Sequence, residues 1–502
     1  MPKLVYRNYI ILPRQGVRFA DDTPRTDVQE SFARLKINVH LDDVLGGNLS
    51  DQSMVIDTTE RGGAKLIRIP ESDLPDLRAR LPGLRIVPEV FYYPQRWRHD
   101  VRSQPARLAG QAQTGVRIRL AEAKTGKPVA DATVVAFTNF DQREGEQATS
   151  DAKGVVSFKN IGNRPIDQLF VYPKTGYWSY WRKNMTLTNT TVVDIQPVKL
   201  DYTDAKRFFY PPKAGDESAG RGVKVGVIDT GAGPHPDLTL AGGACTVTGE
   251  NPTDFADVDE HGTHVSGIIG ARGTAPTGIR GVAPGVDLYM YRVFSKGNPG
   301  ASNFAIIKAI EQAVKDGCDV INMSLGGGPP DDATEDAITF AHENGTICFV
   351  ATGNDGRQPV SFPASFSLSL AVGAMGRKGT FPANTTDAPN VAAPYGTDRK
   401  NFVAEFSNIG NEVDFIAPGV GILSSVPGGY APLSGTSMAC PMAAGVAARL
   451  ISSNKTILSM SRNAARAEAM VQYLAANVKS MGFGPTFEGT GMLFIPQQPI
   501  IT

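Results

Sequence analysis

The pattern of hydrophobic and polar positions divides the chain into three parts, of which the first covers residues 1–95. Apolar positions there fall into short continuous runs and into amphipathic segments with a spacing of three or four. The predicted strands are residues 4–12, 64–69 and 84–91, and the predicted helices lie around Val28, Phe32 and Leu35 and over residues 71–81. This order predicts a small α+β domain, and the polar, proline-containing stretch over 94–110 predicts an exposed linker after it.

The second part, residues 111–200, shows a period of two and no helical pattern. Short alternating runs are separated by turn residues, and the predicted strands are 116–120, 133–137, 155–158, 169–172 and 191–198. Several short strands without helices indicate an all-β sandwich. Aromatic residues gather near its end, and we expect them to pack in the core and at its edge rather than to bind a ligand: Tyr172, Tyr177, Trp178, Tyr180 and Trp181.

The third part, residues 205–502, has the pattern of an α/β domain. Predicted strands over 223–228, 320–324 and 346–350 alternate with helices that begin at Ser302 and near Asp332. The first of these strands is nearly all apolar, as expected for a strand buried on both faces of a parallel sheet. Strand–helix–strand alternation predicts right-handed crossovers, with helices on both faces. Sites in such sheets lie beyond the carboxyl ends of the strands.

Composition and charge narrow the classes of partner. The chain has 502 residues, with 50 Lys and Arg against 50 Asp and Glu, so no net field attracts nucleic acid or an anionic membrane. We therefore expect neither partner. No apolar run approaches the roughly 18 residues of a membrane span, and the first residues lack the apolar core of a signal peptide. Four cysteines do not make a disulfide framework, so a cytoplasmic location is favoured over secretion.

One candidate for chemistry is Asp229, in the run VIDTG directly after the first predicted strand of the α/β domain. An Asp in this place is often only a turn former. Asp-Thr-Gly is also the motif of aspartic proteases, which need two such aspartates sharing a proton. The chain has no second Asp-Thr-Gly or Asp-Ser-Gly, although a symmetric dimer would supply one. The motif alone leaves these alternatives open.

Two further motifs open predicted helices. In HGTHVSG, His261 and His264 have a spacing that suits metal ligands, but the glutamate of His-Glu-x-x-His is missing and no third ligand is near. In GTSMACPMAAG, Ser437 begins a helix among small residues, which allow another backbone to approach closely. The free N–H groups of a helix N-terminus favour an oxyanion there. Each motif alone also fits an ordinary helix start.

Together, Asp229, His261 and Ser437 occur in an order that resembles the subtilisin-like serine proteases. The resemblance spans residues 222–496 and includes GVAP at 281–284, NMSLGG at 322–327, ATGN at 351–354 and IAPG at 416–419. It implies an α/β subtilisin-like catalytic domain and a serine endopeptidase that acts through an acyl-enzyme. In that family pattern Ser437 attacks, His261 transfers the proton and Asp229 orients the imidazole. Asn354 resembles the family's oxyanion asparagine.

The same resemblance implies the residues that bind substrate. They are expected to pair with the main chain of the substrate or to wall the pocket before the scissile bond: Ser324, Leu325, Gly326, Gly327, Ala351, Thr352, Gly353 and Ser361. With no carboxylate at its base, this pocket is expected to accept large apolar side chains. Three acidic residues precede His261: Asp257, Asp259 and Glu260. They are either solvated or face the next substrate residue upstream.

Departures from the family pattern concern metal binding and one loop. The sequence RGTAPTG at 272–278 lacks the asparagine of the family's strong calcium loop, and Asp237 alone does not make a site. We therefore expect no cofactor, and the loop does not support structural calcium. Residues 376–403 are interpreted as an insertion in a surface loop. The chemistry of the triad needs no metal.

Resemblances also extend to the first two parts of the chain. The strand–helix–strand ending over 64–91 resembles the inhibitory prodomains of this family, which implies that residues near Tyr92 to Arg98 lie along the active-site cleft like a product. An ordinary appended α+β domain is the alternative. Residues 125–158 resemble transthyretin-like and carboxypeptidase-regulatory modules. Two other functions stay open for the whole chain: a non-catalytic binding or scaffold protein on a protease fold, and a peptide acyl-transferase with the same triad.

Overall fold

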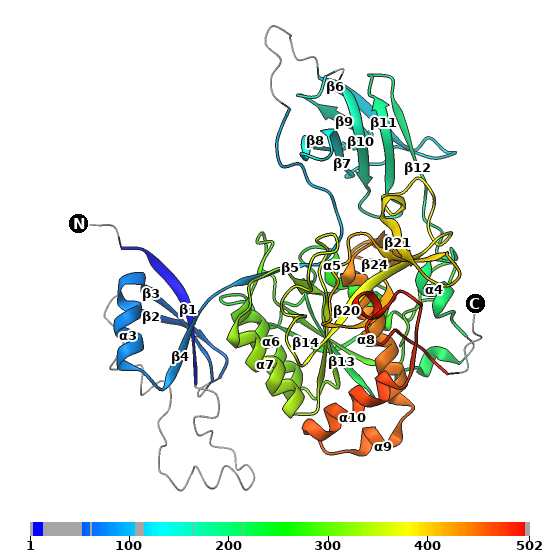
Figure 1. Cartoon of the computed structure of the whole chain (residues 1–502). Helices are drawn as coiled ribbons and strands as arrows, with labels where there is room; N and C mark the ends of the chain where they lie inside the picture. Colours follow the sequence, from blue (N-terminus) through cyan, green and yellow to red (C-terminus); the bar gives the residue numbers. More distant parts are fainter. Residues whose placement is uncertain are drawn as a thin grey trace, which may run out of the picture.

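The structure is a computed structural model that describes residues 4–13, 53–60, 63–105, 115–162, 164–213 and 215–496. The helix expected around Val28, Phe32 and Leu35 lies outside these ranges. Three units follow one another along the chain (Figure 1). We call them the N-terminal unit (residues 4–90), the β-sandwich unit (115–198) and the C-terminal unit (205–496). Among the described residues, no helix is long and apolar enough to cross a membrane.

The N-terminal unit is a four-stranded sheet with one helix on one face. The strand order is β2-β3-β1-β4, and the elements are β1 (Tyr6–Pro13), β2 (Met54–Thr58), β3 (Lys65–Pro70), η1 (Glu71–Asp73), α3 (Leu74–Arg80) and β4 (Leu84–Pro88). Alternation in β1 explains how the unit packs, because successive side chains point to opposite faces. Tyr9 and Ile11 pack with Leu77 of α3, whereas Ile10 and Leu12 join a cluster with side chains of the C-terminal unit.

The β-sandwich unit consists of two sheets around a common core that includes Leu120, Val134 and Leu169. One sheet has the order β11-β10-β7-β8 and the other β12-β6-β9. The strands are β6 (Val116–Glu122), β7 (Thr133–Asn139), β8 (Glu144–Thr149), β9 (Val155–Phe158), β10 (Pro165–Tyr172), β11 (Tyr180–Thr186) and β12 (Val192–Ile195). Two aromatic residues near its end have partners within the protein: Trp178 is buried in a cluster with side chains of the C-terminal unit, and the Trp181 indole donates to Gln168 at 2.8 Å.

The C-terminal unit is built on a nine-stranded sheet of order β14-β15-β13-β17-β19-β20-β22-β21, with β23 also pairing with β20. These strands are β13 (Lys224–Asp229), β14 (Leu240–Cys245), β15 (Asp287–Arg292), β17 (Val320–Met323), β19 (Ile347–Ala351), β20 (Ser369–Arg377), β21 (Val391–Tyr395), β22 (Asn401–Ala404) and β23 (Val413–Pro418). The pairs from β14 to β20, and β20 with β23, are parallel, as the sequence predicts. The pairs of β22 are antiparallel, so the sheet is mixed.

Helices and short elements complete the C-terminal unit. The longer helices are α5 (His261–Gly270), α6 (Asn303–Lys315), α7 (Asp332–Glu343), α8 (Thr436–Ser452) and α10 (Ala464–Ala475). The shorter helices are α4 (Ala205–Phe209), η2 (Asp216–Ser218), η3 (Ala388–Asn390), α9 (Lys455–Ser459) and α11 (Pro485–Glu488). The short strands are β16 (Ala301–Ser302), β18 (Leu325–Gly326), β24 (Ile422–Val426), β25 (Gly429–Leu433), β26 (Val478–Lys479) and β27 (Met492–Leu493). Ser302 caps α6 as expected, by accepting from the Ala305 N–H.

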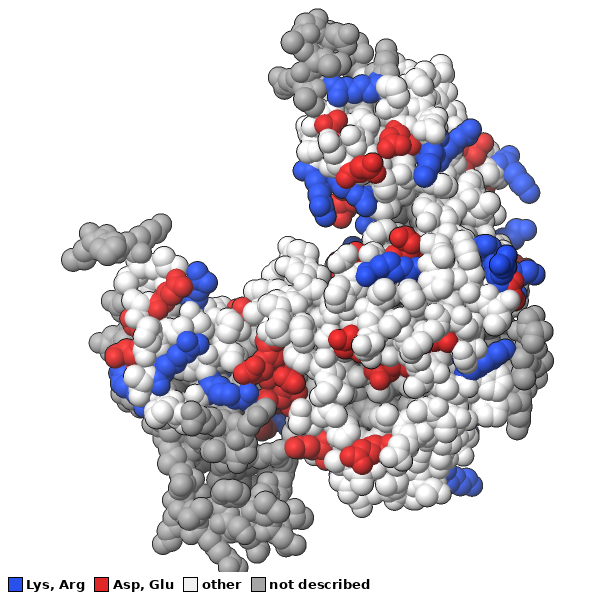
Figure 2. Space-filling model, viewed as in Figure 1, with Lys and Arg blue, Asp and Glu red and all other residues white. Residues whose placement is uncertain are grey.

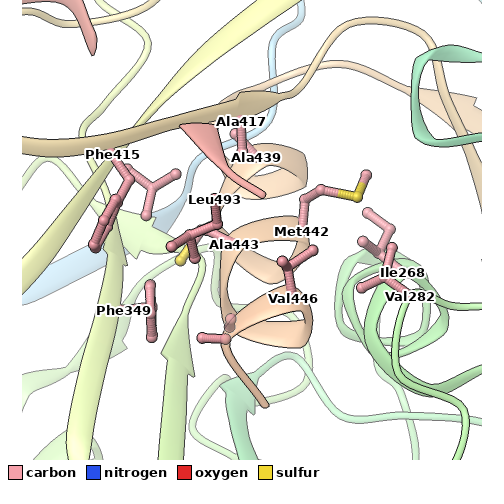
Figure 3. Packing of buried hydrophobic residues seen from close by; sticks show 14 of the residues in the cluster. Ile268, Val282, Phe349, Phe415, Ala417, Ala439, Met442, Ala443, Val446 and Leu493 are labelled. Atoms are coloured by element: carbon pink, nitrogen blue, oxygen red, sulfur yellow. The ribbon is translucent and has the colours of Figure 1, made fainter. Parts of the chain in front are cut away.

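Helix α8 crosses the centre of the C-terminal unit, and small side chains allow it to do so. Figure 3 shows Ala439 and Ala443 on the side of Phe415 and Phe349, with Met442 and Val446 turned toward the chain around Ile268. At Gly445 an added Cβ would lie 2.5 Å from a methyl group of Val282. Close packing on all sides therefore fixes the start of α8, which carries Ser437.

The segment 376–403 differs from the surface-loop insertion expected from the sequence. Its strand β21 pairs with β22 at the edge of the main sheet. It also contacts the β-sandwich unit, because the Trp181 N–H donates to the Asn384 carbonyl at 2.8 Å and the Thr386 hydroxyl bonds to the Ser179 hydroxyl at 2.8 Å. The insertion is thus a docking element between two units.

Candidate active site

The carboxyl end of β13 and the start of α5 bring Asp229 and His261 together. The imidazole Nδ1 lies 2.7 Å from the Asp229 Oδ1, and both side chains are almost fully buried. The same carboxylate oxygen accepts from the Thr230 N–H at 2.7 Å. His261 Nε2 has no hydrogen-bond partner within the described part of the chain. An imidazole held at Nδ1 by a carboxylate leaves Nε2 free to accept a proton.

Ser437 is the second residue of α8, and its hydroxyl donates to the Ser324 carbonyl at 2.8 Å. No hydrogen bond joins it to His261 in the described structure. Gly435 precedes the helix with a φ of 151°, and an added Cβ there would lie 2.4 Å from the Gln95 carbonyl oxygen. The glycine therefore allows another backbone to approach the start of α8, as the small residues around Ser437 predict.

That backbone belongs to the strand β5 (Phe91–Pro94) and the residues after it. Strand β5 leads from the N-terminal unit to the C-terminal unit (Figure 1). There it lies between β16 and β18 and is antiparallel to both. Tyr93 pairs with Gly326, and the Gln95 N–H donates to the Ser324 carbonyl at 3.1 Å. Further along, the Trp97 N–H donates to the Ser434 carbonyl at 2.7 Å. The main chain from β5 to Trp97 thus lies across the site.

The Gln95 carbonyl lies at the start of α8. Its oxygen accepts from the Ser437 N–H at 3.1 Å. The Asn354 side chain is oriented by its Oδ1, which accepts from the Thr436 N–H at 2.9 Å and the Thr436 hydroxyl at 3.0 Å. Its Nδ2 is buried and has no partner in the described ranges. The site therefore holds a carbonyl at one N–H donor and keeps a second donor unused.

Residues expected in the substrate pocket surround the Gln95 side chain. An added Cβ at Gly326 would lie 3.5 Å from the Gln95 Cγ and 2.9 Å from the Ser361 hydroxyl. The Ser361 hydroxyl donates to the Thr352 carbonyl at 3.0 Å. An added Cβ at Gly353 would lie 2.9 Å from the same Ser361 hydroxyl. Glycines therefore leave the space that Gln95 fills.

Two of the expected wall residues are also buried in hydrophobic clusters. Leu325 shares one cluster with Tyr92, and Ala351 lies in the other cluster of the C-terminal unit. Leu325 also pairs with Pro94 through its main chain. The occupant, Gln95, is polar rather than apolar, and its Nε2 donates to the Tyr93 carbonyl at 3.1 Å.

The acidic residues before His261 do not face the residue upstream of Gln95. Asp259 and Glu260 form ion pairs with Arg96, and Glu260 also pairs with Arg98, so both contact residues downstream. Of the two alternatives that the sequence left open, the upstream contact does not form an ion pair among the described residues. Asp257 is partly buried and accepts from the Thr230 hydroxyl and the Thr263 N–H, so it braces the loop.

A pocket for Tyr92 is a feature that the sequence did not reveal. Tyr92 is fully buried, and its hydroxyl donates to Asp331 Oδ2 at 2.5 Å, with the Pro329 carbonyl at 2.9 Å. Asp331 also caps α7 by accepting from the Thr334 N–H, one residue before the Asp332 expected to begin the helix. Burial, with the charge of Asp331, raises the pKa of Tyr92. The contact joins residues far apart in the chain, which local patterns cannot show.

The alternative metal ligands have other partners. His264 Nε2 lies 3.0 Å from the Ile422 and Ala431 carbonyls, and burial lowers its pKa to about 3. Asp237 Oδ2 accepts from the Ile279 N–H at 2.8 Å and the Tyr430 hydroxyl at 3.0 Å. No group of three or more His, Cys, Asp or Glu side chains in the described ranges is placed to hold a metal ion. Both side chains therefore brace loops.

Comparison with known proteins adds an independent observation. Residues 220–484 match the model of the subtilase family. Subtilisin BL of Lederbergia lenta is 40% identical over 230 residues, which are 46% of this chain and 76% of that protein. Subtilisin DY of Bacillus licheniformis is 38% identical over 244 residues, 47% of this chain and 80% of that protein. M-protease of Shouchella clausii is 40% identical over 230 residues, 54% of its length.

Proposed function

The chain belongs to the subtilase family and is a subtilisin-like serine endopeptidase, and we propose that Ser437, His261 and Asp229 form its catalytic triad. One observation carries this assignment. The Gln95 carbonyl accepts from the Ser437 N–H at 3.1 Å, so a peptide bond lies where the Ser437 hydroxyl would attack. The pair of His261 and Asp229 at 2.7 Å supplies the base and its orienting carboxylate.

In the first step, rotation about the Cα–Cβ bond turns the Ser437 hydroxyl from the Ser324 carbonyl toward His261 Nε2. The oxygen attacks the carbonyl carbon while its proton passes to Nε2, and Asp229 stabilises the resulting imidazolium. The carbonyl oxygen becomes an oxyanion, and its donors are the Ser437 N–H and the unused Asn354 Nδ2. Both donors are held before the reaction begins, so no reorganisation is needed to stabilise the charge.

The intermediate then collapses to an acyl-enzyme. The C–N bond breaks, and the proton on Nε2 passes to the leaving amine. Water next gives a proton to Nε2 and attacks the ester carbonyl. Collapse of the second oxyanion releases the acid and returns the proton to Ser437. Each proton that leaves an attacking group is thus returned to a leaving group, and the triad ends as it began.

The experiment that tests this function is labelling by a fluorophosphonate together with casein hydrolysis. The wild-type chain is expected to label at Ser437 and to cut casein, and Ser437→Ala to do neither while keeping its fold by circular dichroism. A folded wild-type chain that fails to label would favour the scaffold function. Mass spectrometry of products from peptide with added amine separates hydrolysis from acyl transfer, because only transfer joins the amine to the new carboxyl end.

We further propose that the N-terminal unit is an intramolecular inhibitor and that the protein is made as a precursor. Support comes from β5, which occupies the cleft between β16 and β18. Hydrogen bonds from the Gln95 N–H to the Ser324 carbonyl and from the Trp97 N–H to the Ser434 carbonyl hold the main chain along this cleft, which supports the proposal. Added as a separate polypeptide, residues 1–98 should inhibit the active enzyme at micromolar concentration. Lack of inhibition would support an ordinary appended domain.

Ion pairs along the boundary of the two units support the same proposal. Lys308 and Lys315 of α6 pair with Asp57 and Glu60, and Arg85 pairs with Asp332. Figure 2 shows basic and acidic side chains meeting where these units touch. Such pairs contribute about 0.2–1 kcal/mol each when exposed, so the apolar face of β1 and the strand β5 account for most of the affinity.

A further inference from the structure

Two carboxylates lie on the side of the site where the leaving group departs. We call Asp259 and Glu260 the acidic lip. Arg96 is the first residue after the Gln95 carbonyl. Its guanidinium forms a bidentate ion pair with the Asp259 carboxylate, with N–O distances of 2.8 and 3.2 Å. Arg98 donates to Glu260 Oε1 at 2.8 Å. The acidic lip therefore contacts the first and third residues after the bond that faces Ser437.

The shape of the acidic lip does not depend on these arginines. The Asp259 N–H donates to Asp257 Oδ1 at 3.0 Å, and the Glu260 N–H donates to Asp259 Oδ1 at 2.9 Å. Asp257 is itself held by the Thr230 hydroxyl and the Thr263 N–H, each at 2.8 Å. The loop is thus braced by its own hydrogen bonds up to His261. Because this loop is preorganised, less conformational entropy is lost when a peptide binds to it.

The basic partners of the acidic lip all come from the segment in the cleft. Within the described chain, Asp259 and Glu260 form ion pairs with Arg96 and Arg98 only. When another peptide occupies the cleft, both carboxylates face the side chains of that peptide. The Glu260 side chain is 13% exposed, so its charge is screened less than that of a surface residue.

We infer that Asp259 and Glu260 are specificity-determining residues that select Arg or Lys at the first and third positions after the scissile bond. The inference rests on the proposed function, since it assumes that Gln95 and Arg96 mark the register of a substrate. Partly buried pairs with good geometry that still reach solvent give modest selectivity, so a basic residue should raise kcat/KM about threefold to tenfold at each position. The gain should shrink at high salt, which screens such pairs.

The test uses the purified full chain after whatever processing it undergoes, with internally quenched peptides. All peptides carry Tyr-Tyr-Pro-Gln before the scissile bond, as this chain does at 92–95, and Arg, Gln or Glu directly after it. The expected order of kcat/KM is Arg, then Gln, then Glu, with the differences reduced in about 1 M salt. A second pair of peptides varies Arg and Gln at the third position.

Variants assign the effect to single carboxylates. Asp259→Asn should reduce the Arg-to-Gln ratio at the first position, and Glu260→Gln at the third. Asp259→Lys should reverse the preference toward Glu, which a purely structural role would not do. Asp287→Asn is the matched control, because it removes one charge beside Lys224, at the opposite end of β13 from Asp229. It should leave both ratios unchanged.

The outcomes separate this inference from the proposed function. Equal rates for the Arg, Gln and Glu peptides, with hydrolysis and labelling of Ser437 intact, would overturn the role of the acidic lip alone. A preference that survives both Asp259→Asn and Asp259→Lys would also overturn it. Absence of hydrolysis and of fluorophosphonate labelling would overturn the proposed function and this inference with it.

Discussion

The backbone N–H of Ser437 donates to the carbonyl oxygen of Gln95 at 3.1 Å. Hydrogen bonds on either side, from the Gln95 N–H to Ser324 and from the Trp97 N–H to Ser434, fix the register of the peptide around this contact. The chain therefore presents one of its own peptide bonds to its candidate nucleophile. Three predictions concern side chains that act on this peptide or on the docking of the N-terminal unit, namely Asn354, Tyr92 and Glu311. A fourth tests whether the bond between Gln95 and Arg96 is cut.

The first prediction concerns Asn354, whose Oδ1 is held by Thr436 and whose Nδ2 is unused. Loss of one oxyanion donor in a subtilisin lowers kcat about 10²–10³-fold, and we expect Asn354→Ala to have an effect of this size. KM should change little, since the donor acts mainly on the oxyanion. Steady-state kinetics on a peptide substrate measures both constants. A kcat within about threefold of wild type would remove Asn354 from the oxyanion hole.

The second prediction concerns the Tyr92 hydroxyl. Tyr92→Phe removes a hydrogen bond to buried Asp331, a kind of contact that contributes about 1.5–3 kcal/mol. Amide exchange at Gln95 and Trp97, measured in a Ser437→Ala background so that no cut occurs, should speed up about 10- to 150-fold. Tyr93→Phe is the matched control, since Tyr93 is 45% exposed. Equal exchange in the two variants would show that Asp331 does not help to hold β5.

The third prediction is a pH dependence. Burial raises the pKa of Glu311 in α6 to about 7 from an ordinary 4.5; the charge of Glu60 adds to this rise, while Thr59, Lys315 and Lys308 oppose it. Thr59 and Glu60 follow β2, so the N-terminal unit helps to cover the carboxyl. The docked state then keeps a proton that the undocked state releases between pH 4.5 and 7. Docking should therefore weaken as the pH rises through this range and level off above it.

Hydrogen exchange in β1–β4 of the Ser437→Ala chain measures this docking at each pH. Comparing Glu311→Gln with its parent at the same pH removes the intrinsic dependence of exchange. The variant should gain protection relative to its parent between pH 4.5 and 7, and the exposed Glu468→Gln on α10 should not. A constant difference across that range would exclude Glu311 as the titrating group.

The sequence predicted what local motifs encode. The apolar run before Asp229, the helix starts at His261 and Ser437, and the parallel arrangement of β13, β17 and β19 follow from periodicity and capping. The positions of Gly326 and Gly353 beside Ser361 follow from the family resemblance. These features depend on residues close in the chain, or on motifs whose spacing is shared by related proteins.

Contacts between segments that are distant in the chain could not be predicted from these local patterns. Nothing near Tyr92 signals that Asp331, in another unit, accepts a hydrogen bond from its hydroxyl. The sequence left open whether the acidic lip is solvated or faces upstream, because the register of the bound peptide is set by main-chain pairing with Gly326, which carries no side-chain signal. The role of residues 376–403 depended in the same way on the surface of the β-sandwich unit.

The intact mass and N-terminal sequence of the purified chain, compared between wild type and Ser437→Ala, show whether Ser437 cuts the peptide bond that it faces. We predict that the wild-type chain is cut between Gln95 and Arg96, so that a new N-terminus appears at Arg96, and that Ser437→Ala remains whole. Cutting at this bond in the Ser437→Ala chain, or no cut there in either chain, would contradict this prediction.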